Sequence, residues 1–224
     1  MSREPVSTLP SRQPAALFDF DGTLLRGDSM LFCLQFVLRR HPASAGAGLK
    51  LLAAAPLFAA GLVDRRGLKE IALGMLRHVP EPERGEFFAQ FTRTSLVPRL
   101  RAAALTRLRW HREQGHRLFL VSASVDLYLA HVARALEIPE LVCSRAVLDP
   151  SPRLLGANCR GEEKVRRVLS HPDAAAIDWE ASWAYGDSAA DVPLMARCGH
   201  PIAVTPNGAL RRIAAERGWT VERW

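Results

Sequence analysis

The feature that most constrains the fold is a regular alternation of short apolar runs and helix-forming stretches in the second part of the chain. After Pro98, such runs occur in the segments HRLFLVSAS, ELVCSRAVLD, ASWAYGDS and HPIAVTPN, with amphipathic stretches between them. Strands that alternate with helices in this way are typical of a parallel, doubly wound α/β sheet. The run AALFDF, which starts at Ala15, predicts one more buried strand of the same sheet. The sequence therefore predicts a Rossmann-like α/β core.

A block without strand patterns separates this first strand from the rest of the core. Residues 28–96 carry apolar residues at helical spacing and predict an all-helical cap inserted into the core. The expected core comprises residues 15–27 and 97–224, and residues 1–14 are expected to be a disordered lead-in. Ligands of such sheets bind at the carboxyl ends of the strands. Because the cap enters directly after the first strand, we expect it to cover that end of the sheet.

Composition and charge are those of a soluble globular protein. Hydrophobic residues make up 48% of the chain and charged residues 24%, which are ordinary values. The net charge of +7 allows either an affinity for anions or simply an Arg-rich surface. Arginines are scattered without basic tracts, so we predict no nucleic-acid partner. The four cysteines lack CxxC spacing and indicate reduced thiols of a cytoplasmic protein. The sequence makes no prediction of the oligomeric state.

One apolar stretch in the cap has two interpretations. Residues 51–63, LLAAAPLFAAGLV, are too few to span a membrane and are interrupted by Pro56. Arg39 and Arg40 precede the stretch, and two further arginines follow it. It could be a cap helix packed against its neighbours, or a segment that dips into an anionic membrane and makes the protein membrane-associated. The second interpretation would favour a lipid-headgroup phosphate as the substrate.

Polar residues follow three of the predicted strands, and a lysine begins one of the predicted helices. Because carboxyl ends of parallel strands meet at one edge, we expect these side chains in one cleft. Like-charged carboxylates roughly 4 Å apart repel by about 4 kcal/mol at an effective dielectric near 20, so the cluster needs a cation. Oxygen ligands favour Mg²⁺ over zinc. The residues concerned are Asp19, Asp21, Ser122, Lys164, Asp187 and Asp191.

This set of side chains suits phosphoryl transfer. A metal and Lys164 would neutralise phosphoryl oxygens, and the Ser122 hydroxyl would donate a hydrogen bond to them. Asp19 would attack phosphorus and form an aspartyl phosphate. Asp21 would protonate the leaving oxygen and later deprotonate the attacking water.

The motifs DFDGT, LVSAS, GEEK and GDSAAD occur in the order and rough spacing of the four motifs of the haloacid dehalogenase superfamily. From Ala15 to Trp224 the chain resembles the phosphoserine phosphatase-like branch, whose members insert a helical cap between the first and second motifs. The resemblance implies Asp19 as the nucleophile and Asp21 as the acid/base. It also implies Mg²⁺ bound by the Asp19 side chain, the Asp21 main-chain carbonyl and Asp187. Asp191 would act on the metal indirectly, and Ser122 and Lys164 would hold the phosphate.

The chain departs from that branch at four positions. Asp28 stands where phosphoserine phosphatases carry a glutamate that contacts the substrate amine, so it is a candidate substrate residue or a helix N-cap. The second motif reads Ser-Ala-Ser in place of Ser-Gly-Gly, and Ala190 replaces an asparagine of the fourth motif. The departures affect specificity more than chemistry.

The expected activity is a Mg²⁺-dependent phosphatase acting on a small or lipid-headgroup phosphomonoester. The alternatives are a phosphotransferase or phosphomutase of the same chemistry, and a basic binding module without catalysis. A dehalogenase is disfavoured, because displacement of halide does not use the acid that Asp21 supplies.

Overall fold

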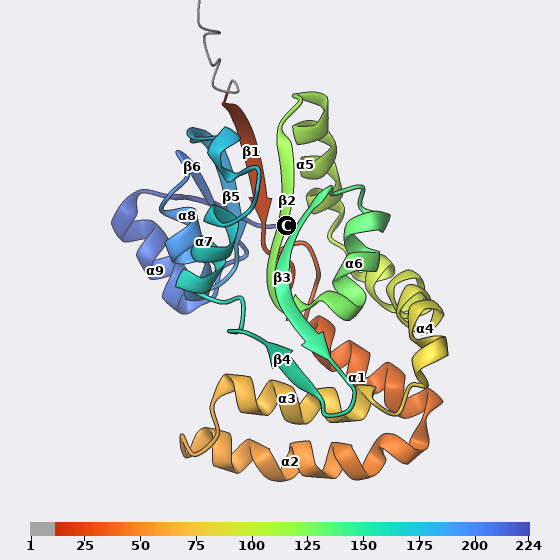
Figure 1. Cartoon of the computed structure of the whole chain (residues 1–224). Helices are drawn as coiled ribbons and strands as arrows, with labels where there is room; N and C mark the ends of the chain where they lie inside the picture. Colours follow the sequence, from red (N-terminus) through yellow and green to blue (C-terminus); the bar gives the residue numbers. More distant parts are fainter. Residues whose placement is uncertain (1–11) are drawn as a thin grey trace, which may run out of the picture.

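The computed structural model describes residues 12–224, and its centre is a sheet with strand order β4-β3-β2-β1-β5-β6-β7 (Figure 1). Neighbouring strands pair in parallel, except that β4 runs antiparallel to β3. The predicted doubly wound α/β core is confirmed. The strands are β1 (Gln13–Phe18), β2 (Arg117–Val125), β3 (Glu140–Val147), β4 (Arg153–Leu155), β5 (Ile177–Gly186), β6 (His200–Val204) and β7 (Thr220–Glu222).

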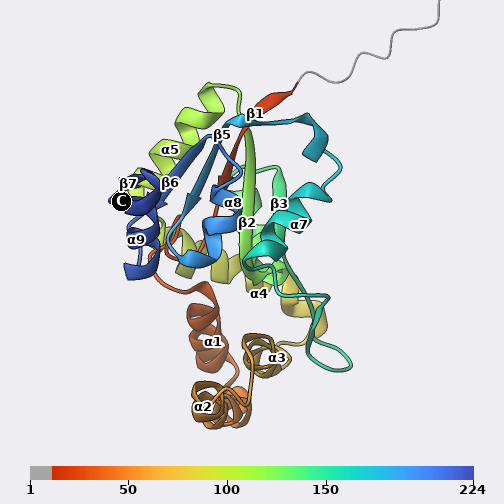
Figure 2. The same cartoon turned by 90° about the vertical axis from the view of Figure 1, so that its left-hand side faces the viewer.

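Helices cover both faces of the sheet (Figures 1 and 2). They are α1 (Ser29–Arg40), α2 (Ala45–Ala59), α3 (Arg65–Leu76), α4 (Arg84–Phe91), α5 (Ala102–Glu113), α6 (Asp126–Ala135), α7 (Glu162–Leu169), α8 (Val192–Met195) and α9 (Gly208–Arg217). Side chains of a strand alternate between the two faces. Accordingly, Ala16 and Phe18 of β1 belong to the apolar cluster under α5 and α6, whereas Ala15 and Leu17 belong to the cluster under α7, α8 and α9. All four are fully buried, which explains why this strand is apolar from Ala15 to Phe18.

The inserted block is helical and lies at the carboxyl end of the sheet (Figure 1). Helices α1, α2 and α3 form a group below the strand ends, with α2 farthest from the sheet (Figure 2). Helix α4 instead packs against α6 of the core. The chain leaves and re-enters the core through two paired segments: Arg26 N–H donates to Arg99 C=O (3.0 Å), and Arg101 N–H donates to Leu24 C=O (2.9 Å). The cap is thus held to the core by two adjacent connections.

One sequence expectation needs correction, and one strand was not predicted. Strand β1 begins at Gln13, so the lead-in expected over 1–14 is too long by Gln13 and Pro14; residues 1–11 lie outside the described part of the chain. Pro14 is tolerated because the pairing of β1 with β5 is irregular between Pro14 and Ala16. The segment after β3 also contains a further strand, β4, which forms a hairpin with β3.

Candidate active site

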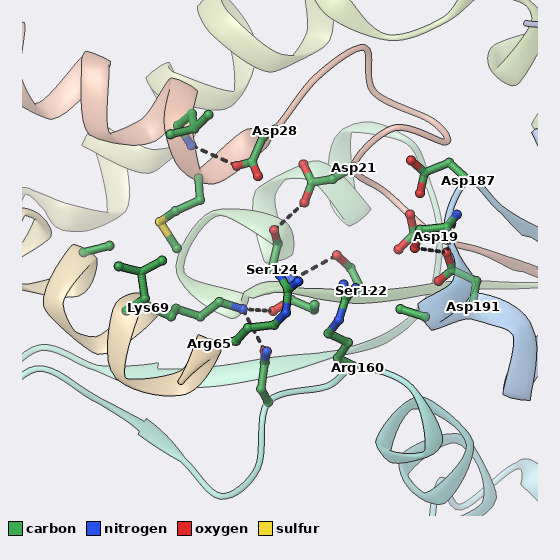
Figure 3. Close-up of a pocket in the computed structure, with 18 of the residues that line it drawn as sticks. Asp19, Asp21, Asp28, Arg65, Lys69, Ser122, Ser124, Arg160, Asp187 and Asp191 are labelled. Carbon is green, nitrogen blue, oxygen red and sulfur yellow. Dashed lines mark hydrogen bonds between the residues drawn. The ribbon is translucent and has the colours of Figure 1, made fainter. Parts of the chain in front are cut away.

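The carboxyl ends of β1, β2 and β5 open into a cavity of about 420 Å³ that is closed on the other side by α1, α2 and α3. Asp19 follows β1 directly, Ser122 lies near the end of β2, and Asp187 follows β5. Figure 3 shows the carboxylates facing one another on the core side of this cavity. The structure places every sequence-predicted site residue in its wall: Asp19, Asp21, Asp28, Ser122, Lys164, Asp187 and Asp191.

Lys164 lies between two buried carboxylates. Its Nζ is 2.6 Å from Oδ1 of Asp19 and 2.6 Å from Oδ1 of Asp191, and the lysine is only 2% exposed. Burial alone would lower the pKa of Lys164, but the two carboxylates outweigh it and hold that pKa above its usual value. Lys164 is therefore a fixed positive charge at the base of the cavity.

Asp19 is a buried carboxyl group whose pKa is strongly raised. Burial raises the pKa of Asp19 to about 8, the Asp191 charge adds to the rise, and Lys164 offsets part of it. The Thr23 hydroxyl donates a hydrogen bond to Oδ2 of Asp19 (3.1 Å), and Lys164 holds Oδ1. Both oxygens are thereby fixed in position. Such a carboxylate gains its charged, nucleophilic form when a further cation binds beside it.

The donor set fits a divalent cation of the magnesium type. Oxygens of Asp19, Asp187 and Asp191 lie within 4.8 Å of one another. Burial, with the Asp191 charge, raises the pKa of Asp187 to about 6, so this group too lacks sufficient positive charge nearby. Lys164 supplies one positive charge for three carboxylates, and an all-oxygen set suits Mg²⁺. Asp191 accepts hydrogen bonds from Lys164 and from the Ser188 hydroxyl (2.9 Å). These contacts agree with the expectation that Asp191 acts on the metal indirectly.

Gly22 leaves the space that the Asp187 carboxylate occupies. This glycine has φ +82°, and a Cβ atom there would lie 2.2 Å from Oδ2 of Asp187. A side chain at position 22 would therefore be strained and would displace the carboxylate. The glycine of DFDGT is explained by this close approach between the first and fourth motifs.

Asp21 has a different set of hydrogen-bond partners from Asp19. The Ser29 N–H donates to its Oδ1 (2.6 Å), and the Ser124 hydroxyl donates to its Oδ2 (2.5 Å). Burial raises the pKa of Asp21 above its ordinary value, although the Ser124 hydrogen bond works against the rise. A carboxyl group with a raised pKa can hold a proton near neutral pH, as a general acid must. The hydroxyls of Ser29 and Tyr128 extend this hydrogen-bonded chain into the core.

The cap side of the cavity combines charged and apolar groups (Figure 3). Lys69 of α3 reaches the core, where its Nζ donates to the Ala123 C=O and to Oδ1 of Asn158, both at 2.7 Å. Burial lowers the pKa of Lys69 to about 8, and the charges of Asp21 and Asp28 limit the decrease. Arg65 also lines this side, together with apolar residues of α1, α2 and α3, and Arg160 lines the cavity from the core segment before α7.

These geometrical features agree with comparisons with known proteins. The model of the haloacid dehalogenase-like hydrolase family matches residues 16–196. The chain belongs to this family. A probable phosphatase of Mycobacterium tuberculosis is 27% identical over 97% of this chain and 77% of its own length. A Bordetella pertussis protein of unknown function has a crystal structure with a TM-score of 0.83 and 29% identity, covering 94% of this chain and 98% of that one.

A solved phosphoserine phosphatase shares the fold of this haloacid dehalogenase-like hydrolase. The TM-score is 0.63 at 16% identity, with 90% of this chain and 91% of that chain covered. The expected family is confirmed, and the chain has the fold of a phosphoserine phosphatase.

The residues at which this hydrolase differs from the phosphoserine phosphatase-like branch lie at the cavity. Asp28 caps α1 by accepting a hydrogen bond from the Leu31 N–H (3.0 Å), and it also lines the cavity, so the two sequence interpretations do not exclude each other. Ser124, where the branch has glycine, contacts the carboxyl of Asp21. Ala190 also faces the cavity and leaves space there.

Sequence reasoning missed Lys69, Arg65, Arg160 and Ser124 as residues of the site. One signal could have found Lys69: the chain has only three lysines among 30 basic residues, and two of them line the cavity. A lysine kept in an Arg-rich sequence indicates a position where a compact, single charged group is required.

Proposed function

We propose that this protein is a Mg²⁺-dependent phosphomonoester phosphatase that works through a phosphorylated Asp19. The observation that supports this most strongly is the buried arrangement of Asp19 beside Lys164, with a second, separately held acid two residues further on. A nucleophile that requires a cation and an acid that retains a proton are the two groups that this chemistry needs.

The metal ion would be held by the Asp19 and Asp187 carboxylates and the Asp21 main-chain carbonyl, and it would neutralise charge on the phosphoryl oxygens. Lys164 would add a second positive charge, and Ser122 would donate its hydroxyl proton to a phosphoryl oxygen. These residues would orient the phosphorus for attack from the side of β1.

Two steps account for hydrolysis. In the first, an Asp19 carboxylate oxygen bonds to phosphorus, the ester P–O bond breaks, and Asp21 gives its proton to the leaving alkoxide. In the second, Asp21 takes a proton from water as the water oxygen attacks phosphorus. The bond between phosphorus and Asp19 then breaks, and inorganic phosphate leaves. Asp21 thus ends in its starting state.

The substrate is proposed to be a small or lipid-headgroup phosphomonoester with polar groups beyond the phosphate. Asp28 offers one negative charge in the wall of the cavity, whereas Arg65, Lys69 and Arg160 offer positive charges across from it (Figure 3). A leaving group with both an amino function and an anionic or hydroxyl function would match this pattern.

The test is turnover of p-nitrophenyl phosphate by the purified chain, followed by a panel of amino-alcohol, sugar and lipid phosphates. We expect hydrolysis with Mg²⁺, loss of activity with EDTA, and loss again in Asp19→Asn. Asp173→Asn, which changes a half-exposed aspartate outside the cavity, should remain active. Absence of turnover across the panel in the presence of Mg²⁺ would contradict the proposal. Transfer of the phosphoryl group to an added alcohol in preference to water would indicate the phosphotransferase instead.

A further inference from the structure

Helix α2 is apolar on nearly all sides, and most of it is uncovered. Ala54 is its buried residue, and Leu49 and Leu52 are 67% and 71% exposed. Leu57 within the helix and Leu62 just after it are exposed by 45% and 75%. A helix with this composition is normally found inside a protein core or in contact with lipid. Here it packs against α3 along one side and lies at the edge of the molecule farthest from the sheet (Figures 1 and 2).

These exposed leucines are not scattered, because most of them belong to one long apolar helical segment. By length and composition alone, the helical segment Pro42–Ala59 would be able to cross a membrane, and only 11% of it is buried. In the fold, however, α2 is one layer of a helical cap, held by α3 on its inner side. This position suits a helix that lies along an interface better than one that spans a bilayer.

The charged residues around α2 indicate that a binding partner of this surface would be negatively charged. The sequence has no acidic residue between Asp28 and Asp64, but it has Arg39, Arg40 and Lys50 in that interval. All three are exposed, and Lys50 lies in α2 itself. A two-fold contact between two copies through this helix would bring like charges together. An anionic bilayer would satisfy both the leucines and the basic residues.

We propose that α2 and the turn up to Leu62 form a docking surface for anionic lipid bilayers, with the helix lying in the headgroup region. The exposed leucines enter the acyl boundary, and the basic residues contact lipid phosphates. Leu51 and Phe58 of the same helix line the catalytic cavity, so docking holds the cavity close to the bilayer surface. Docking itself does not depend on the proposed phosphatase activity.

Sedimentation with vesicles tests this surface independently of turnover. The full chain should bind phosphatidylcholine vesicles that contain phosphatidylglycerol at least about tenfold better than vesicles of phosphatidylcholine alone, and salt should weaken the binding. Leu52→Glu should lower binding about tenfold, and Lys50→Gln about fivefold on the anionic vesicles only. Leu169→Glu, at a leucine 44% exposed at the end of α7, should bind as the parent does.

These variants change exposed side chains, and unchanged circular dichroism and melting temperature would verify that they fold. Equal, negligible binding of the parent to both vesicle types would overturn the proposal. So would parental binding by Leu52→Glu, or an equal loss of binding in Leu169→Glu. A dimer of the parent that Leu52→Glu dissociates, without vesicle binding, would assign the surface to a second copy instead.

Discussion

Replacement of Lys164 by methionine tests whether one buried cation holds the carboxylates of the candidate site together. The side chains are of similar length, so the variant keeps much of the packing and removes two charged contacts of 2.6 Å, to Asp19 and to Asp191. Loss of one partner from a buried ion pair costs roughly 3–5 kcal/mol of unfolding free energy. The remaining carboxylate oxygens lie within 4.8 Å of each other. At that separation, two full charges repel by about 3.5 kcal/mol at an effective dielectric near 20.

The size of the loss should depend on pH, because Asp19 can escape the repulsion by binding a proton. Its pKa is raised by burial to about 8 from the unfolded value of 3.8, and loss of Lys164 would raise it further. Between these values the folded state binds more protons than the unfolded state, so stability increases as pH falls. In the absence of divalent metal, we therefore expect the free energy of unfolding of Lys164→Met to be lower than that of the wild type by about 3–5 kcal/mol at pH 9 and by clearly less at pH 6.

Urea unfolding followed by tryptophan fluorescence, with EDTA present, measures the free energy of unfolding at both pH values. Lys50→Met removes an exposed lysine and should unfold as the wild type does. Turnover by Lys164→Met should fall about 10²–10³-fold. A variant with wild-type stability at both pH values would refute the assignment of Lys164 as the charge that stabilises this cluster.

Three further changes follow from the site and the core. Gly22→Ala should weaken Mg²⁺ activation about tenfold or more, as read from the metal dependence of turnover, because its Cβ would displace Asp187. Ser124→Ala should raise the pKa of Asp21, because a hydrogen bond that lowers this pKa is lost. The part of the pH–rate profile that reports Asp21 should therefore shift to higher pH. The third concerns His111, buried beneath the sheet, whose pKa is lowered by burial from 6.5 to about 3. Between these pH values the unfolded chain binds more protons than the folded chain. Acidification from pH 7 to pH 5 should therefore lower the free energy of unfolding of the wild type by about 2 kcal/mol, and His111→Asn should not show this decrease.

Each of these changes has a control or a contrary outcome. Gly115→Ala places a side chain at φ +71° with no atom within 4 Å, so it reproduces the backbone strain without touching the site and should leave metal activation unchanged. A pH–rate profile of Ser124→Ala identical to that of the parent would contradict the role given to its hydroxyl. Equal slopes of stability against pH in the wild type and His111→Asn would show that this histidine titrates normally.

The grouping of the candidate site residues at one edge of the core was predictable, because the sequence patterns that indicate it are local. Apolar strands with Asp19, Ser122 and Asp187 at or near their ends can be recognised within a few residues, and parallel packing brings strand ends to one edge. The helical cap was predictable for a similar reason, since its helices carry their own periodicity and their own N-caps, such as Asp28 and Asp64.

Features that depend on long-range packing could not be predicted in this way. The reach of Lys69 to the Ala123 carbonyl requires α3 to lie over the end of β2, which no local pattern specifies. The contact of Ser124 with Asp21 has the same origin, because it joins two strand ends. Strand β4 has only three residues and an alternation too short to distinguish from a loop. The apolar stretch of α2 fits a packed helix and an exposed one equally well, and only the fold shows its exposure.

The most direct test of the central claim is the detection of a phosphoryl group on Asp19 during turnover. Wild-type protein would be mixed with excess substrate and Mg²⁺, quenched in acid within the first turnover, digested, and analysed by mass spectrometry. We predict a hydroxylamine-sensitive phosphoryl adduct on the peptide that contains Asp19, increased in Asp21→Asn, which cannot activate water, and absent in Asp19→Asn. Rapid substrate hydrolysis without any such adduct, together with turnover by Asp19→Asn, would contradict the account.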